Sequence, residues 1–146
     1  MDAVDRQILA LLVEDGRRTY DDIAGRVSLS GPSVKRRVDR LLAAGILRGF
    51  SAVVDPMALG SRTEALVELF YAPGTLLDEV TRRLSRHPEV VEAWSVTGDA
   101  DAIARVRALD NADLERLIME LQRDGLVERT RSQVVMSQLV RRVTPS

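Results

Sequence analysis

The sequence of 146 residues contains no cysteine and only one histidine, His87. The absence of cysteine excludes disulfide bonds, thiol catalysis and thiolate metal sites together. A single histidine leaves little for imidazole coordination of a metal ion. Because His87 precedes a proline, we expect it to cap the last carbonyls of a helix. The sequence therefore predicts no catalytic residues, no metal site and no cofactor.

Long apolar runs are also missing from the chain. No stretch approaches the length that spans a bilayer, and the first residues, Met1 to Asp5, lack the basic and then apolar pattern of a secretory signal. The apolar content of 45% is enough for one medium domain or two small domains with a buried core. We expect a soluble, cytoplasmic protein without a membrane partner.

A large excess of charge of one sign is absent as well, since the formal net charge is -1. The charges are unevenly distributed. Residues 1–54 carry nine Lys and Arg against seven Asp and Glu, whereas the remainder carries twelve against fifteen. The N-terminal excess is modest, so specific binding to DNA would need locally clustered cations and more than one copy of the protein.

The most clearly delimited element is a helix between Ser30 and Gly45. Ser30 suits the N-cap, Pro32 suits the first turn, and Gly45 suits a left-handed C-terminal stop. Apolar residues at helical spacing form one buried stripe: Val34, Val38, Leu41 and Leu42. The other faces carry the cations Lys35, Arg36, Arg37 and Arg40. Taken alone, these cations are equally consistent with a solvated helix face.

A second short helix is predicted immediately upstream, over residues 20–27, with Ile23, Ala24 and Val27 facing inward. Only Ser28 and Leu29 separate the two helices, so they must cross steeply. This spacing predicts a helix-turn-helix motif, in which the second helix is offered to the major groove of DNA. Ser28 occupies the position where a turn glycine is commonest, and a left-handed conformation there costs a non-glycine residue roughly 1 kcal/mol.

The rest of the N-terminal part completes this unit. Residues 2–14 form a further helix, and residues 46–55 favour a strand that Pro56 ends. The hydrophobic period changes from helical to alternating at Thr63, which predicts a domain boundary near residues 55–61. We expect a helix-turn-helix domain with a linker strand over residues 1–55 and a second domain over residues 61–146.

The second domain has the order strand, helix, strand, strand, helix, strand. The expected elements are a strand from Thr63, a helix capped by Thr75, strands 90–97 and 102–108, a helix capped by Asp110 or Asn111, and a strand 130–140. This order predicts an antiparallel ferredoxin-like sheet with both helices on one face, and hence an α+β fold. The uncovered face includes Trp94, Val96 and the apolar run 134–136, so we expect self-association, at least into a dimer.

Over nearly its whole length the chain resembles the leucine-responsive regulator and asparagine-regulator (Lrp/AsnC) family of transcription factors. The resemblance lies in the order and spacing of several segments: 12–17 (LVEDGR), 23–30 (IAGRVSLS), 34–41 (VKRRVDRL), 44–49 (AGILRG), 54–56 (VDP) and 98–101 (GDAD). It implies an N-terminal helix-turn-helix, plain or winged, that binds double-stranded DNA. It also implies a ferredoxin-like domain that dimerises, assembles further, for example into octamers, and binds a small effector, usually an amino acid.

The resemblance also indicates where the sites should lie. For DNA we expect contacts from the start and the cationic faces of the second helix of the motif: Ser30, Ser33, Lys35, Arg36, Arg37 and Arg40. An arginine can bind guanine O6 and N7 or a phosphate, and the sequence does not separate these roles. The effector cleft is expected between subunits, with Gly98, Asp99, Ala100 and Asp101 from one subunit and Glu128, Thr130 and Ser132 from its neighbour.

Simpler or different functions stay open at this point. The segment 98–101 is also a favourable hairpin turn, because Gly and Asp tolerate positive backbone angles. One branch of proteins with a similar architecture decarboxylates tetrapyrroles such as sirohaem, although a chain with one histidine fits that chemistry poorly. A third alternative is an assembly module, independent of any effector, whose helix-turn-helix contacts protein. The leading hypothesis is a sequence-specific transcriptional regulator that responds to an amino acid.

Overall fold

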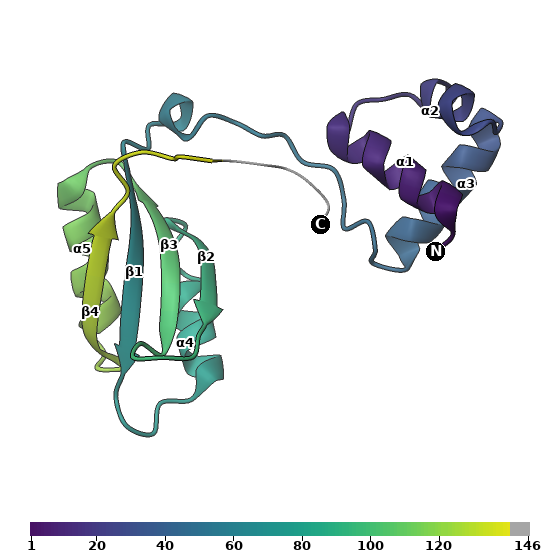
Figure 1. Cartoon of the computed structure of the whole chain (residues 1–146). Coiled ribbons are helices and arrows are strands. Elements are labelled where there is room, and N and C mark those ends of the chain that lie inside the picture. The colour runs from purple at the N-terminus through teal and green to yellow at the C-terminus, as the bar shows by residue number, and fades with distance from the viewer. Residues whose placement is uncertain (141–146) are drawn as a thin grey trace. The chain divides into compact units, whose positions relative to one another are not determined.

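The computed structural model describes residues 1–140, and these divide into two compact units, one of residues 1–53 with 139–140 and one of residues 54–138 (Figure 1). The final residues of the expected second domain, 141–146, lie outside the described residues. No helix within residues 1–140 is long and apolar enough to cross a membrane. Each unit has its own hydrophobic core.

The N-terminal unit consists of α1 (Ala3–Glu14), α2 (Tyr20–Val27) and α3 (Gly31–Ala43). Its core combines apolar side chains from all three helices: Ile8, Leu12, Ile23, Ala24, Val27, Val34 and Val38. The expected helix-turn-helix is thus confirmed. The turn between α2 and α3 places Ser28 at φ 55°, and Ser28 is the one non-glycine residue with positive φ in the part of the chain that the structure describes.

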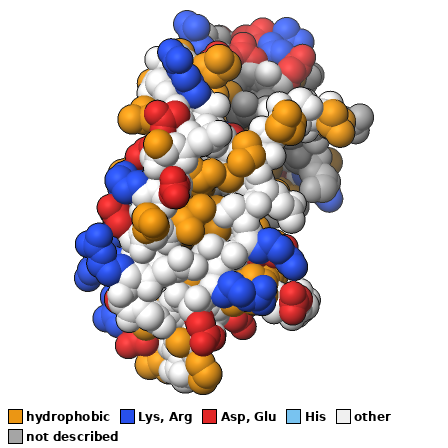
Figure 2. Space-filling view, turned by 90° about the vertical axis from the view of Figure 1, so that its left-hand side faces the viewer, with side chains coloured by type: hydrophobic (Ala, Val, Ile, Leu, Met, Phe, Trp, Pro, Cys, Tyr) orange, Lys and Arg blue, Asp and Glu red, His pale blue; other side chains and the backbone are white. Residues whose placement is uncertain are grey.

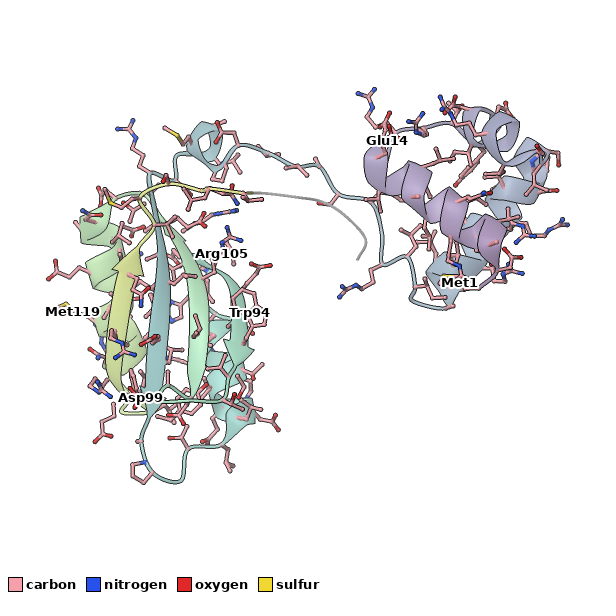
Figure 3. All side chains as sticks on the ribbon, in the orientation of Figure 1. Met1, Glu14, Trp94, Asp99, Arg105 and Met119 are labelled. Carbon is pink, nitrogen blue, oxygen red and sulfur yellow. The ribbon has the colours of Figure 1, made fainter. Side chains whose placement is uncertain are left out.

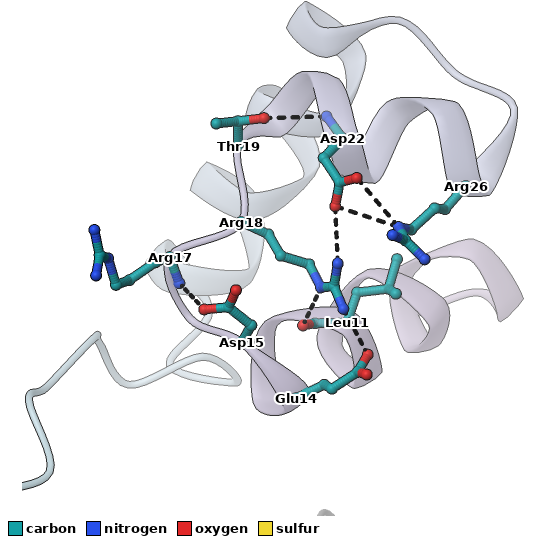
Figure 4. A network of polar contacts seen from close by, with 8 residues as sticks. All are labelled: Leu11, Glu14, Asp15, Arg17, Arg18, Thr19, Asp22 and Arg26. Carbon is teal, nitrogen blue, oxygen red and sulfur yellow. Dashed lines mark hydrogen bonds and ion pairs between the residues drawn. The ribbon is translucent and has the colours of Figure 1, made fainter.

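Arg18 joins the first two helices of this unit (Figure 4). Its guanidinium donates to the Leu11 carbonyl at the end of α1, to Glu14 at 2.8 Å and to Asp22 of α2 at 3.0 Å. Asp22 also accepts a bond from Arg26 one turn further along α2. These bonds keep the start of α2 beside the end of α1 and leave α3 as the helix with a largely exposed outer face.

The ends of α3 follow the sequence prediction only in part. Gly45 adopts φ 67°, and the N–H groups of Gly45 and Ile46 close the helix on the carbonyls of Leu42 and Leu41, as predicted for a left-handed stop. Ser30 occupies the N-cap position, but the prediction that it caps the helix is wrong. Its hydroxyl donates to the Ser33 hydroxyl at 2.9 Å and makes no bond to the helix backbone.

The predicted linker strand over residues 46–55 is absent from the structure. This segment has β-branched and aromatic residues, but within residues 1–140 no strand pairs with it to supply ladder hydrogen bonds, and the chain there is irregular. A short 3₁₀ helix, Pro56–Leu59, follows, with Asp55 accepting the Met57 N–H at 3.0 Å. Gly60 then leads into the sheet at φ 88°.

The C-terminal unit is a four-stranded antiparallel sheet in the order β2-β3-β1-β4, with α4 and α5 on one face (Figure 1). Its elements are β1 (Thr63–Tyr71), α4 (Leu77–Leu84), β2 (Val90–Ser95), β3 (Ala102–Ala108), α5 (Asn111–Gln122) and β4 (Val127–Val134). The core lies between the sheet and the helices and includes Val67, Leu69, Val106, Leu117 and Leu121. The predicted ferredoxin-like α+β fold is confirmed.

Some boundaries in this unit differ from the sequence prediction. β4 begins at Val127 and not at Thr130, because the buried Val127 pairs with Tyr71 after a register shift in β1, and it ends at Val134. Thr75 does not cap α4, since its hydroxyl donates to the Leu126 carbonyl and the helix begins after Leu76. The other helix of this unit, α5, is capped by Asp110, whose carboxylate accepts the Asp113 N–H at 2.9 Å.

The face of the sheet without helices carries ion pairs between strands as well as apolar side chains. Glu64 on β1 bonds Arg105 at 2.7 Å and Arg107 at 3.0 Å, both on β3. Burial alone would raise the pKa of the Glu64 carboxyl, but the bonds from the two arginines outweigh it, so this pKa lies below its usual range. Leu66 and Trp94 remain partly exposed on this face. Elsewhere too, hydrophobic side chains at the surface lie among charges of both signs (Figure 2).

Candidate functional site

The outer face of α3 is the first candidate site. Val34, Val38 and Leu41 are buried against the other helices, so the remaining side chains of α3 face sideways or outward. Lys35, Arg36 and Arg40 are exposed, whereas Arg37 is only half-buried, with 26% of its side chain accessible. The structure therefore brings the predicted cations together on one helix but does not expose them equally.

Arg37 and Arg40 are bound to the start of α1. Arg37 Nη1 donates to Asp2 Oδ2 and to Asp5 Oδ1, both at 2.7 Å, and Arg40 Nη2 lies 3.1 Å from both oxygens of Asp5. Arg37 is therefore not a free cation on a solvated helix face. No local sequence pattern indicates this pairing, because 32 residues separate Arg37 from Asp5.

Asp5 is the acceptor at the centre of this cluster, and its residue is 1% exposed. The Asp2 backbone N–H donates to Asp5 Oδ2 at 2.9 Å, and the Asp5 N–H donates back to Asp2 Oδ1 at 2.8 Å, which forms a capping box at the start of α1. The bond from the Asp2 N–H, together with Arg37 and the charge of Arg40, lowers the pKa of Asp5 to about 2 against the opposing effect of burial. Asp5 therefore remains a carboxylate at neutral pH.

Lys35 and Arg36, the other two cations of α3, differ from Arg37 and Arg40 in their partners. Lys35 Nζ donates to Asp39 Oδ2 at 2.6 Å, one turn along the same helix, and both side chains are more than half exposed. Arg36 takes part in no ion pair within residues 1–140 and is exposed. By its position on α3 it lies nearly opposite the buried stripe. Arg36 is therefore the one exposed cation of the four that has no ion pair within residues 1–140.

The N-terminus of α3 is packed closely against α2. A β-carbon at Gly31 would lie 2.2 Å from an oxygen of the Asp21 carboxylate, so a side chain there would require Asp21 to change its rotamer. The hydroxyls of Ser30 and Ser33 lie next to each other at the same end of α3. Both serines are therefore at the edge of the cationic face, as the sequence predicts, although their hydroxyls bond each other.

The turn between β2 and β3 is the second candidate site (Figure 3). Asp101 Oδ2 accepts the Tyr71 N–H at 2.8 Å, and the Asp101 N–H donates to the Leu69 carbonyl at 3.0 Å. Gly98 adopts φ 126°, a conformation that a side chain would strain, and Ala100 is buried. The turn is thus fixed against the end of β1, and Asp101 is already engaged by the backbone.

Asp99 is the freer carboxylate of this turn. Its side chain is 73% exposed, and Nη2 of Arg131 on β4 lies 3.8 Å from its Oδ2. Arg131 also pairs with Glu68 on β1. Sequence reasoning missed Arg131, because only the pairing of β1 with both β3 and β4 brings it near the turn.

The structure does not bring the whole predicted effector set together within one chain. Thr130 and Ser132 pair directly with Leu69 and Val67, so they face the helix side of the sheet. Thr130 is 3.5 Å from the Gln122 amide of α5. Glu128 is exposed, next to the register shift of β4. From the sequence, Glu128, Thr130 and Ser132 are expected to contribute to the cleft from a neighbouring subunit.

His87 and Trp94 are the remaining side chains that the sequence analysis singled out. The backbone N–H of His87, and not its imidazole, donates to the Leu84 carbonyl at the end of α4, so the prediction of a side-chain cap is wrong. The imidazole Nδ1 lies 3.7 Å from Glu120 of α5. Trp94 is half exposed on the open face of the sheet. Within residues 1–140 no cluster of three or more His, Asp or Glu could hold a metal ion.

A helix-turn-helix unit followed by a four-stranded α+β unit defines a class of DNA-binding regulators. Comparison with known proteins identifies the family. Residues 1–42 match the AsnC-type helix-turn-helix domain, and residues 64–145 match the Lrp/AsnC ligand-binding domain. The chain belongs to the Lrp/AsnC family of transcriptional regulators.

Individual relatives agree with this assignment over nearly the full length. The HTH-type transcriptional regulator Rv2324 of Mycobacterium tuberculosis is 44% identical over 99% of this chain and 98% of the relative. A solved AsnC family transcriptional regulator from Agrobacterium tumefaciens is 27% identical, with a TM-score of 0.91 over 100% of this chain and 97% of that one. The feast or famine regulatory protein of M. tuberculosis, solved with L-methionine, is 31% identical, with a TM-score of 0.90 over 96% and 95%. The names are those of transcriptional regulators and decide against the enzyme alternative.

Proposed function

We propose that this protein is a sequence-specific transcriptional regulator that inserts α3 into the major groove of duplex DNA, and that an amino acid changes its assembly or its affinity for the operator. The observation that carries the first part is Arg36, an exposed arginine without an ion pair in residues 1–140, on the second helix of a helix-turn-helix. An arginine in this position is free to donate two bonds to one guanine.

The other residues of α3 would share the contacts with DNA. Lys35 is held by Asp39 only through a solvent-exposed pair within one helix, a weak interaction that yields readily to a phosphate. Ser30 and Ser33 are placed to donate to phosphates at the start of the helix. Arg37 and Arg40 retain unused N–H donors beyond those bound to Asp5.

A dimer or a larger assembly, such as an octamer, would present two copies of α3 to one operator. The open face of the C-terminal sheet supports this part of the proposal, because Trp94 is 48% exposed and Leu66 37% exposed there. Two linked helix-turn-helix units bind half-sites about one helical turn apart. The operator should therefore be an imperfect palindrome.

The turn 98–101 is the proposed effector site. A free amino acid carries an ammonium group, for which the exposed Asp99 carboxylate is a partner, and a carboxylate, to which Arg131 can donate with the N–H groups not bound to Glu68. Glu128, Thr130 and Ser132 of a neighbouring subunit would complete the cleft. The relative solved with L-methionine supports an amino acid as the class of ligand. A ligand shared by two subunits changes the stability of the assembly and thereby its affinity for DNA.

Two measurements test this function. First, DNA that the full-length protein selects from a random pool should bind more tightly than a scrambled duplex, with an affinity that falls steeply with salt concentration because of phosphate contacts. Second, a thermal-shift screen of the amino acids should show at least one that raises Tm, since a ligand of the folded state stabilises it. Absence of any DNA preference would contradict the regulator, and absence of any thermal shift would leave a regulator without an amino-acid effector.

A further inference from the structure

The arginines of α3 fall into two groups that differ in their partners. Arg37 and Arg40 both bond the carboxylate of Asp5, at 2.7 Å and 3.1 Å, whereas Arg36 has no acidic partner in the described chain. Asp5 lies on α1, outside the helix-turn-helix itself. A residue of the first helix therefore determines the state of two cations on the helix proposed to bind DNA.

Asp5 is well placed to fix these cations. It is the one buried polar or charged residue in the described chain, and the Asp2 N–H anchors its Oδ2 independently of the arginines. Removing the cationic partners of a buried carboxylate strongly destabilises a folded protein. The guanidinium groups of Arg37 and Arg40 should therefore remain bound to Asp5 in the protein without DNA. Their side-chain freedom is then already restricted before DNA arrives, which lowers the entropy lost on binding in the correct register.

We propose that Asp5 is a positioning residue for DNA recognition. This inference rests on the proposed function of α3. Asp5 holds one edge of each guanidinium, so Arg37 and Arg40 can use only their remaining N–H donors on DNA, while Arg36 moves freely. The carboxylate also offsets part of their charge and so weakens the attraction to phosphates of any sequence. Asp5 therefore favours the operator over other DNA.

A purely structural ion pair between α1 and α3 predicts a different outcome. Loss of such a pair would lower the folded fraction and reduce binding to every duplex in the same proportion. The preference between two duplexes and the salt dependence of binding would stay unchanged, because neither depends on the concentration of folded protein. These two quantities therefore separate positioning from mere stabilisation.

The test compares full-length variants on two duplexes, one selected by the wild type from a random pool and one scrambled. Asp5→Asn removes the central carboxylate. Asp2→Asn removes one bond to Arg37 but keeps the helix start, because Asn and Asp are equally good N-caps. Glu14→Gln is the control, since it removes one negative charge of α1 that pairs with Arg18 and not with α3. Binding is measured by fluorescence anisotropy at several KCl concentrations.

For Asp5→Asn we expect tighter binding to the scrambled duplex and a steeper dependence of log K on log salt, by about 0.9 for each additional phosphate that the protein neutralises. The preference for the selected duplex should fall by about fivefold or more, the equivalent of one weakened base contact. Asp2→Asn should also steepen the salt dependence and lower the preference for the selected duplex, each by a smaller amount. Glu14→Gln should resemble the wild type.

A folded Asp5→Asn, verified by circular dichroism, with wild-type preference and salt dependence would overturn the positioning role and leave the proposed function intact. The positioning role would also be overturned if the preference and salt dependence of Asp5→Asn differ from the wild type by no more than those of Glu14→Gln. If Asp5→Asn does not fold, Asp2→Asn decides, and unchanged preference and salt dependence in that variant overturn the inference. A wild type that prefers no selected duplex overturns both this inference and the proposed function.

Discussion

The Asp101 carboxylate accepts the backbone N–H of Tyr71 at 2.8 Å, which fixes the turn between β2 and β3 against the end of β1. Asp99, two residues earlier, makes no such bond to the backbone and is mostly exposed. The two carboxylates of one short turn are therefore unequal. Asp101 is suited to shape the turn, and Asp99 to meet a cation.

The first prediction follows from this difference. Asp99→Asn should abolish the change in assembly or operator affinity caused by an amino acid, with effector-free DNA binding retained, because it removes the available counter-charge for the ammonium. Asp101→Asn keeps an acceptor for Tyr71 and should affect ligand binding less than Asp101→Ala, which releases the turn. Calorimetric titration and light scattering with an amino acid that scores in the thermal screen provide the measurement. An undiminished response in Asp99→Asn would show that the turn is only structural.

The second prediction separates two neighbouring arginines of α3. Arg36→Ala should weaken operator binding by roughly 1 to 3 kcal/mol at a fixed salt concentration, with Tm nearly unchanged, since within residues 1–140 the side chain has no ion pair to lose. Arg37→Ala should lower Tm as well, because it removes two bonds to the carboxylates at the start of α1. Thermal melts and anisotropy of both variants are the measurements. Equal Tm values for the two variants would contradict the different roles.

The third prediction concerns acid. The pKa of Asp5 is about 2 in the folded protein and about 3.9 in an unfolded chain. The unfolded state therefore takes up the proton first as pH falls, and the stability that Asp5 contributes is present above pH 4 and lost as pH falls to about 2. Urea unfolding of the wild type and Asp5→Asn should give a stability difference that shrinks over this range. A difference independent of pH would show that Asp5 has an ordinary pKa.

The fourth prediction uses the left-handed turn residue Ser28. Ser28→Gly should raise the stability of the protein by up to about 1 kcal/mol, because glycine adopts φ 55° without the strain of a β-carbon. Ser28→Val should lower it, since a β-branched side chain is disfavoured there. Chemical denaturation reports both changes. Stability that follows side-chain polarity instead of the order Gly, Ser, Val would contradict this explanation.

The fifth prediction is that the fragment from Ser61 onward folds alone and is at least dimeric. It contains the complete core of the C-terminal unit, and Trp94 and Leu66 on its open face remain accessible in the single chain. Sedimentation at micromolar concentration measures the mass, and Trp94→Arg should shift the fragment toward monomer. A monomeric wild-type fragment would contradict assembly through this face.

Local patterns in the sequence were sufficient to predict most of the fold. The helical stripe of Val34 and Val38 and the alternation of Ala104 and Val106 with arginines each reflect burial of one side, so the element type follows directly. Residues 46–55 have the composition of a strand, but a strand also needs a partner, which composition does not reveal. The limits of β4 likewise depended on its pairing with Tyr71.

The candidate sites were predictable as positions but not as chemical environments. The cations of α3 could be located from helical spacing, whereas the bond between Arg37 and Asp5 joins residues far apart in the sequence. In the same way, the approach of Arg131 to Asp99 depends on the order of strands in the sheet. Side chains that meet through tertiary packing leave no periodic signal, and these contacts decide which charges are free.

The strand order β2-β3-β1-β4 leaves β2 and β4 as the edges of the sheet, where unpaired backbone groups are able to nucleate aggregation. The two edges are protected in different ways. β4 carries the charged residues Glu128, Arg129 and Arg131, and two such edges paired parallel and in register would place like charges opposite each other. β2 is short, and the register shift between Val90 and Glu92 interrupts its regular ladder. The sheet can therefore offer its open face to another copy while both of its edges resist the growth of a continuous fibril.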